Sequence, residues 1–228
     1  MKSAVVIPTY NEADNIEGLV RAIHEACPEI DVIVVDDASP DGTAAIAHGL
    51  DGVHVIERAG KLGLGTAYVA GFNYTMGEGY EAICSMDADF SHDPKVLPAL
   101  LALMDDYDVG IGARYMPGGG TRNWGVHRQI LSRSANLVAK AMLHMPATDV
   151  TSGYRCYRRH VLERVALDTL HSEGYSFLVE LLFRCVKQGF RIGQTPIVFE
   201  ERRGGVSKLD KSEIWRGMVN LVRLRFGG

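Results

Sequence analysis

The stretch Ala82–His92 reads AICSMDADFSH, an apolar run that ends in two carboxylates spaced two residues apart. The same change from apolar to polar occurs in Val5–Glu12, which reads VVIPTYNE, and in Val34–Gly42, which reads VVDDASPDG. Short apolar runs that end in turn residues are typical of buried strands. Three strands that each end in chemically useful residues indicate an α/β fold with its site beside the strand ends.

Strands and amphipathic helices alternate through the first half of the chain. We expect strands at Ala4–Ile7, Val32–Val35, Val53–Ile56, Ala82–Met86 and Val109–Gly112, and helices at Ala13–Ala26, Gly42–Gly49, Thr66–Met76 and Pro94–Met104. This alternation predicts a mainly parallel sheet that helices cover on both faces. Because the carboxyl ends of parallel strands meet at one edge, Tyr10, Asp37, Asp87 and Asp89 are expected there.

The second half of the chain is less regular. We expect a loop at Met116–Gly120, helices at Gln129–Leu143, Phe177–Lys187 and Glu213–Phe226, and a strand at Gln194–Phe199. The sequence contains no internal repeat and no obvious linker between domains. A chain of 228 residues therefore suits one large domain that ends in an amphipathic helix.

Charge is distributed unevenly along the chain. Residues 1–112 contain 5 Lys and Arg against 19 Asp and Glu, residues 113–160 contain 8 against 1, and residues 202–228 contain 7 against 2. An acidic half suited to a cation thus precedes basic segments suited to phosphate groups or an anionic membrane surface. No apolar run approaches the roughly 18 residues of a membrane span. The first strand begins too close to Met1 for a signal peptide, which predicts an intracellular protein.

The two carboxylates of the opening stretch suit a divalent cation. Residues i and i+2 of a strand point to the same side, so Asp87 and Asp89 can converge on one ion. A site with few carboxylates leaves room for substrate phosphates around Mg²⁺ or Mn²⁺. Other chemistry is less well supported, because Gly63–Tyr68 lacks the third glycine of a dinucleotide fingerprint. The chain also has no P-loop lysine motif, and its serines lack a nucleophile elbow.

Together with other segments, these motifs resemble the family 2 glycosyltransferases, which have the GT-A fold, and among them the dolichol-phosphate or polyprenol-phosphate mannosyltransferases. The matching segments are Ile7–Glu12, Asp36–Thr43, Lys61–Tyr68, Met86–His92, Gly112–Tyr115, Ser132–Asn136 and Arg202–Leu209. They cover nearly the whole chain in order. The third and the last two are the most specific to the polyprenol-phosphate branch.

The resemblance implies a metal-dependent, inverting transfer of mannose from GDP-mannose to a dolichyl or polyprenyl monophosphate. Residues 1–112 would bind the nucleotide sugar and the metal, and residues 113–228 the acceptor. The implied nucleotide-sugar residues are Pro8, Tyr10, Glu12, Val35, Asp37, Asp87 and Ala88, with Asp87 and Asp89 holding Mg²⁺ or Mn²⁺. Asp89, Arg114, Arg202 and Lys208 would be catalytic, and Arg128 and Arg133 would bind the acceptor phosphate.

The implied acceptor is itself a nucleophile. The second pKa of a phosphate monoester lies near ~6, so at neutral pH the reaction needs no dedicated general base. Glu180 is the one spare carboxylate, with an ion pair to Arg184 as the alternative interpretation. The basic amphipathic stretches Gln129–Leu143 and Glu213–Phe226 indicate either peripheral contact with the cytoplasmic face of a membrane or ordinary core packing. Nucleic acid is not an expected partner.

Three other functions remain open at this point. The same chemistry with UDP-glucose or a UDP-N-acetylhexosamine is the nearest. A catalytically silent nucleotide-sugar-binding module is the second, although Asp87, Asp89, Arg114 and Lys208 are all present. A nucleotidyltransferase is the third, and it requires a Gly-rich basic loop after the first strand, where this chain has Pro8–Glu12.

Overall fold

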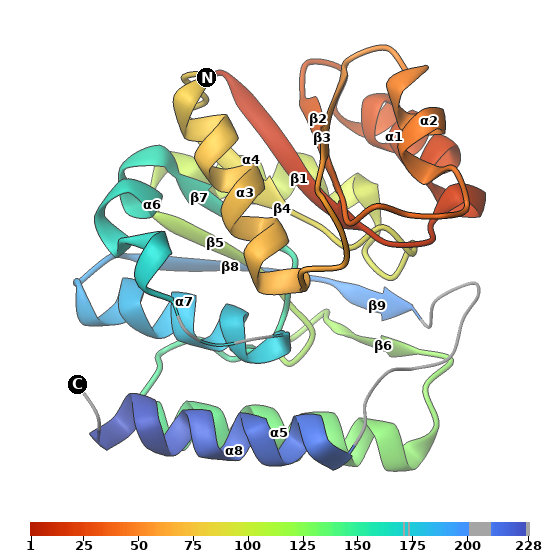
Figure 1. Ribbon diagram of the computed structural model, residues 1–228. Helices are drawn as coiled ribbons and strands as arrows, with labels where there is room; N and C mark the ends of the chain where they lie inside the picture. Colours follow the sequence, from red (N-terminus) through yellow and green to blue (C-terminus); the bar gives the residue numbers. More distant parts are fainter. Residues whose placement is uncertain (171, 173, 201–210, 227–228) are drawn as a thin grey trace.

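The computed structural model describes residues 1–170, 172, 174–200 and 211–226 (Figure 1). The strands are β1 (Ser3–Thr9), β2 (Asp31–Asp36), β3 (Val53–Glu57), β4 (Ala82–Ser85), β5 (Val109–Ala113), β6 (Gly120–Arg122), β7 (Arg155–Arg158), β8 (Ile192–Pro196) and β9 (Val198–Glu200). The helices are α1 (Ala13–Ala26), α2 (Thr43–His48), α3 (Leu64–Gly77), α4 (Leu97–Ala102), α5 (Val126–Leu143), α6 (Arg159–Val165), α7 (Tyr175–Lys187) and α8 (Lys211–Phe226).

The main sheet has the strand order β3-β2-β1-β4-β7-β5-β8. Every neighbouring pair in it is parallel except the two pairs that β7 makes with β4 and β5. A second, two-stranded parallel sheet joins β6 to β9. The prediction of a mainly parallel sheet in a single α/β domain is therefore confirmed.

Helices cover both faces of the main sheet, and each face has its own core. Val5 and Ile7 of β1 pack with buried residues of α1, α2 and α4 on one side. Ala4 and Val6 face α3, α6 and α7 on the other, as the alternation of side chains along a strand requires. Helix α3 lies so close to the sheet that a Cβ atom at Gly71 would come within 2.3 Å of Val6 Cγ1. The absence of a side chain at this position allows the close packing of helix against strand.

Helices α5 and α8 form a further layer beside α7 and lie next to each other (Figure 1). Ala139 and Leu143 of α5 and Leu221 of α8 join the core on the α3 and α7 side of the sheet. Among the described helices, none combines the length and the hydropathy that a membrane span requires. Helices α5 and α8 therefore pack against the rest of the domain through the faces that contain Ala139, Leu143 and Leu221.

Three differences from the predicted elements have clear physical causes. The expected helix Pro94–Met104 divides into a 3₁₀ turn at Pro94–Val96, α4 and a second turn at Leu103–Asp105. The first division lies beside Pro98, which has no amide hydrogen to donate to the carbonyl of Pro94. The expected strand Gln194–Phe199 divides after Pro196 into β8 and β9, which belong to different sheets. The glycine-rich stretch predicted as a loop ends in β6, whose partner β9 is distant in sequence.

Candidate active site

The carboxyl ends of β1, β2 and β4 lie at one edge of the sheet. Thr9 pairs with Asp36 in register, and Val6 pairs with Ser85, so all three strands end close together. Tyr10, Asp37 and Asp87 follow these strand ends directly or after one residue. The prediction that they share one edge is confirmed.

Asp36 ties the loops after β1 and β2 together. Its side chain is 1% exposed and accepts hydrogen bonds from Thr9 Oγ1 at 2.7 Å, Ser39 Oγ at 2.6 Å and the Ser39 amide at 2.7 Å. Ser39 Oγ in turn accepts a bond from the Asn11 amide at 3.0 Å. Ala38 adopts a φ of 54°, a conformation that costs free energy outside glycine and that this network holds in place.

Asp37, one of the implied nucleotide-sugar residues, holds the loop that contains Leu62 and Gly63. Its Oδ1 lies 2.6 Å from Arg58 Nη1, and its Oδ2 accepts the amides of Leu62 and Gly63, each at 3.1 Å. A carboxylate offers about four acceptor positions, so these three contacts leave room for one further donor. Beside this loop, Lys61 Nζ lies 4.0 Å above the ring of Tyr10. The arrangement suits one N–H of a base at Asp37.

The acidic turn, residues 87–92, follows β4 and is held by contacts within it. Asp89 is 6% exposed, and its Oδ1 accepts the Ser91 amide at 3.0 Å. Asp87 is more open, with 28% of its side chain exposed. Phe90, which follows Asp89 in the chain, adopts a φ of 59°. Its ring points to α1, where a Cβ atom at Gly18 would lie 3.5 Å from Phe90 Cζ. Burial lowers the pKa of His92, although the charges of Asp87 and Asp89 oppose that effect. The neutral imidazole adds no positive charge to the turn.

The donor groups of this turn fit a Mg²⁺ or Mn²⁺ ion that also binds phosphate oxygens. Among the described residues, no cluster of three or more His, Cys, Asp and Glu side chains could hold a metal alone. Asp87 and Asp89 would supply hard oxygen ligands, and the remaining positions of the ion would go to water and substrate. Ser91, whose amide donates to Asp89, is 2% exposed.

Arg114 lies at the end of β5 in a buried ion pair. Its Nε and Nη2 lie 2.7 and 2.9 Å from the two carboxylate oxygens of Asp149, and Nη2 also donates to Thr151 Oγ1 at 2.7 Å. Burial alone would lower the pKa of Arg114, but the hydrogen bonds and charge of Asp149 outweigh it and raise that pKa. Burial likewise opposes the ionisation of Asp149, and Arg114 keeps the pKa of that carboxyl below its ordinary value. The pair is charged at neutral pH.

Arginines and aromatic rings form a cluster around this ion pair, which we call the arginine–aromatic cluster. The Arg128 guanidinium lies 4.1 Å from the centre of the Trp124 ring, and that of Arg133 lies 5.9 Å from the Tyr115 ring. Trp124 meets Phe199 edge to face at 5.3 Å. Phe199 also meets His92 edge to face at 5.2 Å. The acidic turn and the arginine–aromatic cluster are thus in direct contact through Phe199.

The remaining predicted residues have different positions. Val35 is fully buried within β2, so its burial does not support a nucleoside contact; strand alternation turns its side chain into the core. Pro8 is half-buried near the end of β1, Glu12 caps α1 through its carbonyl, and Ala88 is 4% exposed in the acidic turn. Arg202 and Lys208 lie outside the described residues. Glu180 pairs with Arg184 at 2.6 Å, which confirms the alternative interpretation of that residue.

Several residues of the site were not predicted from the sequence. Tyr68 and His92 lie inside motifs quoted above, yet no role was assigned to either. Arg155, completely buried in β7, donates to the carbonyls of Val150, Ser152 and Leu178 and so holds the loop before β7. The concentration of polar residues in Thr148–Gly153, after a long helix, is the signal that could have indicated this loop.

Two curated relatives align with almost the whole chain. The polyprenol monophosphomannose synthase of Mycolicibacterium smegmatis is 45% identical over 227 residues, covering 97% of this chain and 86% of the relative. The undecaprenyl-phosphate mannosyltransferase of Micrococcus luteus is 42% identical, covering 98% of this chain and 93% of the relative.

Solved structures share the fold at lower identity. Glucosyl-3-phosphoglycerate synthase from Mycobacterium tuberculosis, in complex with Mn²⁺, UDP and phosphoglyceric acid, superposes with a TM-score of 0.73 and 20% identity. That match covers 99% of this chain and 78% of the other, and a complex with Mg²⁺ and UDP superposes with a TM-score of 0.71. The GT-A-like fold is thereby confirmed. Residues 4–166 match the family described as Glycosyl transferase family 2, and the chain belongs to that family.

Proposed function

We propose that this glycosyltransferase transfers mannose from GDP-mannose to a polyprenyl monophosphate with the help of Mg²⁺ or Mn²⁺. The names of the two relatives above 40% identity support the mannosyl group and the polyprenyl acceptor. GDP as the nucleotide follows from the resemblance to the mannosyl branch. The products would be a polyprenyl phosphomannose and GDP.

The observation that carries this proposal is the contact between the acidic turn and the arginine–aromatic cluster. Asp87 contacts His92, whose ring meets Phe199. Phe199 in turn meets Trp124, over which Arg128 lies. A donor diphosphate bound with a cation at the acidic turn would therefore adjoin guanidinium groups suited to a second phosphate. Donor and acceptor phosphates repel each other, and this arrangement offsets that repulsion from both sides.

The chemistry follows from the charges of the two substrates. A bound cation would neutralise the charge that develops on the leaving diphosphate. Arg128 and Arg133 would hold the acceptor phosphate by charge-assisted hydrogen bonds and aim one oxygen at the anomeric carbon. Attack from the face opposite the leaving group would invert the configuration. Since the phosphate oxygen is already ionised at neutral pH, no residue needs to remove a proton.

Product formation tests the reaction. Purified protein would be mixed with radiolabelled GDP-mannose, Mn²⁺ and a short polyprenyl phosphate, and the label in the lipid phase would be measured. We expect lipid-linked mannose that disappears in excess EDTA. Calorimetry with GDP and UDP should show tighter binding of GDP. Tighter binding of UDP, with transfer from a UDP-sugar, would instead identify a polyprenyl-phosphate glucosyl- or N-acetylhexosaminyltransferase. Binding of a nucleotide sugar without any transfer would indicate a binding module.

We also propose that the α5 and α8 layer reaches the lipid acceptor from the membrane surface. Exposed apolar side chains lie on both helices: Val126, Ile130, Leu131 and Leu137 on α5, at 42–69% exposure, and Met218, Val219, Val222 and Phe226 on α8, at 41–77%. Arg133, Arg223 and Arg225 are exposed on the same helices. Exposed apolar side chains beside basic ones favour binding at an anionic lipid interface. Leu221, on the same helix as Met218 and Val222, is buried against the core.

Vesicle co-sedimentation tests this contact. Wild type should sediment with phosphatidylglycerol vesicles and not with phosphatidylcholine vesicles, and high salt should reverse the binding. Arg223→Gln with Arg225→Gln should weaken it, at about 1 kcal/mol per basic residue. The matched control removes two exposed arginines elsewhere, Arg21 and Arg191. Equal sedimentation of both double variants would contradict a membrane role for α8.

A further inference from the structure

Asp87 lies just beyond the end of β4, so its main chain is not part of the sheet. The ladder between β1 and β4 ends where the Met86 amide donates to the Val6 carbonyl at 3.1 Å. The next amide, that of Asp87, donates instead to Nδ1 of His92 at 3.2 Å. A side chain thus takes over from the neighbouring strand as the partner that orients Asp87.

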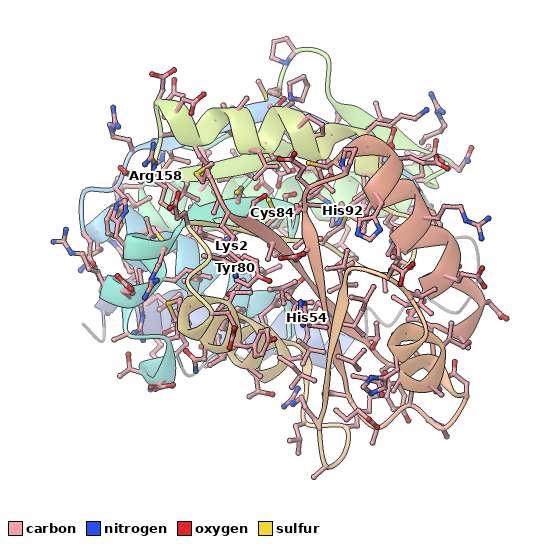
Figure 2. All side chains as sticks on the ribbon, turned by 90° about the horizontal axis from the view of Figure 1, so that it is seen from above. Lys2, His54, Tyr80, Cys84, His92 and Arg158 are labelled. Atoms are coloured by element: carbon pink, nitrogen blue, oxygen red, sulfur yellow. The ribbon has the colours of Figure 1, made fainter. Side chains whose placement is uncertain are left out.

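The surroundings of His92 hold this acceptor rigidly. The ring is 1% exposed, stacks on Tyr154 with centroids 4.8 Å apart, and meets Phe199 edge to face. Its Cε1 lies 3.8 Å from the position of a Cβ at Gly153, so the loop before β7 closes over it. The buried Nε2 has no hydrogen-bond partner among the described residues, so the polar contacts of the ring are those of Nδ1, which lies 3.2 Å from the Asp87 amide and 3.8 Å from Asp87 Oδ2. Figure 2 shows His92 among the side chains near α1.

A second buried residue contacts the carboxylate of Asp87 directly. Tyr68, on α3, is completely buried, and its hydroxyl donates to Asp87 Oδ1 at 3.4 Å. Its ring stacks on Phe177 with an interplanar angle of 6° and on Phe72 with an angle of 21°. These contacts leave the Tyr68 side chain little freedom. The hydroxyl therefore marks a defined position for one oxygen of Asp87.

We propose that His92 and Tyr68 are positioning residues that set the direction in which Asp87 presents its carboxylate to a divalent cation. His92 acts on the main chain of Asp87 and Tyr68 on its side chain. The inference rests on the metal role in the proposed function. It also assigns a role to two buried residues of the motifs Met86–His92 and Lys61–Tyr68. Partners that orient a metal ligand typically change metal affinity when removed.

A pair of substitutions at His92 separates the hydrogen bond from the packing. His92→Asn and His92→Gln both remove the ring, but only Asn places an oxygen at the position of Nδ1. We expect Mn²⁺ binding, measured by electron paramagnetic resonance in the presence of GDP, to weaken about tenfold in the Gln variant. The Asn variant should stay within about threefold of wild type. Both variants should show a similar loss of melting temperature, because both lose the ring.

A pair of buried tyrosines provides the second test with a matched control. Tyr68→Phe removes the hydroxyl that donates to Asp87, whereas Tyr80→Phe removes a hydroxyl that donates to Asp31 Oδ2 at 2.7 Å. Figure 2 shows Tyr80 beside Lys2 and away from His92. We expect Mn²⁺ affinity to fall about fivefold in Tyr68→Phe and to stay unchanged in Tyr80→Phe. GDP affinity without metal should be the same in both.

The outcomes distinguish this inference from the function on which it rests. Wild-type protein that binds no Mn²⁺ with or without GDP would contradict the metal role itself and the inference with it. Wild-type protein that binds Mn²⁺, together with His92→Gln and Tyr68→Phe variants of undiminished affinity, would overturn only the positioning role. If His92→Gln does not fold, the two tyrosine variants decide the question. An equal loss in the Asn and Gln variants would assign His92 to packing alone.

Discussion

The acidic edge of the sheet and the arginine–aromatic cluster hold charged side chains in different ways. At the acidic edge, carboxylates follow regular parallel strands and accept hydrogen bonds largely from amides and hydroxyls of neighbouring loops, as Asp36 does. In the cluster, the cations come from α5 and from the end of β5, and they are held by aromatic faces or by one buried carboxylate, as Arg114 is. The first arrangement joins the loops that follow adjacent parallel strands, whose ends meet at one edge of the sheet. The second depends on contacts between residues far apart in sequence.

The largest effect should follow from breaking the buried ion pair of the cluster. Arg114→Met leaves the completely buried carboxylate of Asp149 without its partner. Breaking such a pair typically costs about 3–5 kcal/mol of folding free energy. We expect a loss of that size in denaturant unfolding. A loss below about 1 kcal/mol would show that water or other groups replace Arg114.

The same pair predicts a pH dependence. Because the pKa of Asp149 is lowered in the folded protein, its contribution to stability is present at neutral pH. That contribution is lost as the pH falls below the unfolded-state value of about 3.9 and through the lower folded-state pKa. The stability difference between wild type and Asp149→Asn should therefore be constant near pH 7 and shrink in acid. A difference that grows as the pH falls would contradict the assigned charge state.

A comparable effect, on activity rather than stability, is expected at the acidic edge. Asp89→Ala removes one of two carboxylates suited to the cation and should reduce turnover by about 10²–10³-fold. Its melting temperature should change little, since the side chain makes a local contact with the Ser91 amide. Asp106→Ala, an exposed residue, serves as the control. Full turnover of the Asp89 variant would exclude it from the site.

The two regions also differ in how far the sequence predicts them. Asp37 and Asp87 were placed correctly because strand periodicity and turn residues are local signals, and parallel strands bring their ends together. The partner of Arg114 could not be predicted, because Asp149 lies 35 residues away on a loop with no periodic pattern. Strand β7 was missed for a related reason: Arg155 reads as an exposed residue, yet main-chain carbonyls satisfy its buried guanidinium. The role of Val35 stays a prediction that its burial does not support, because a residue inside a strand can share a motif while its side chain faces the core.

A smaller effect should distinguish the two arginines of α5. Arg128 lies over Trp124 in a half-buried position, whereas Arg133 is exposed near Tyr115. Replacing either with Gln should raise the KM for polyprenyl phosphate and leave GDP affinity unchanged. We expect this KM to rise about tenfold in Arg128→Gln and by a smaller factor in Arg133→Gln, because a less solvated cation interacts more strongly with phosphate. Equal donor and acceptor effects would move these residues out of the acceptor site.

The smallest effect is expected where an ion pair lies on the surface. Arg122 Nη1 lies 2.8 Å from Glu200 Oε1 across β6 and β9, with 65% and 42% of the two side chains exposed. Exposed pairs contribute about 0–1 kcal/mol, so Arg122→Gln should barely change stability. This small sheet nevertheless carries Phe199, which joins the acidic turn to the cluster. If Arg122→Gln reduces turnover several-fold at unchanged stability, the position of Phe199 depends on that surface pair; if turnover is also unchanged, the aromatic contacts with His92 and Trp124 hold the ring without it.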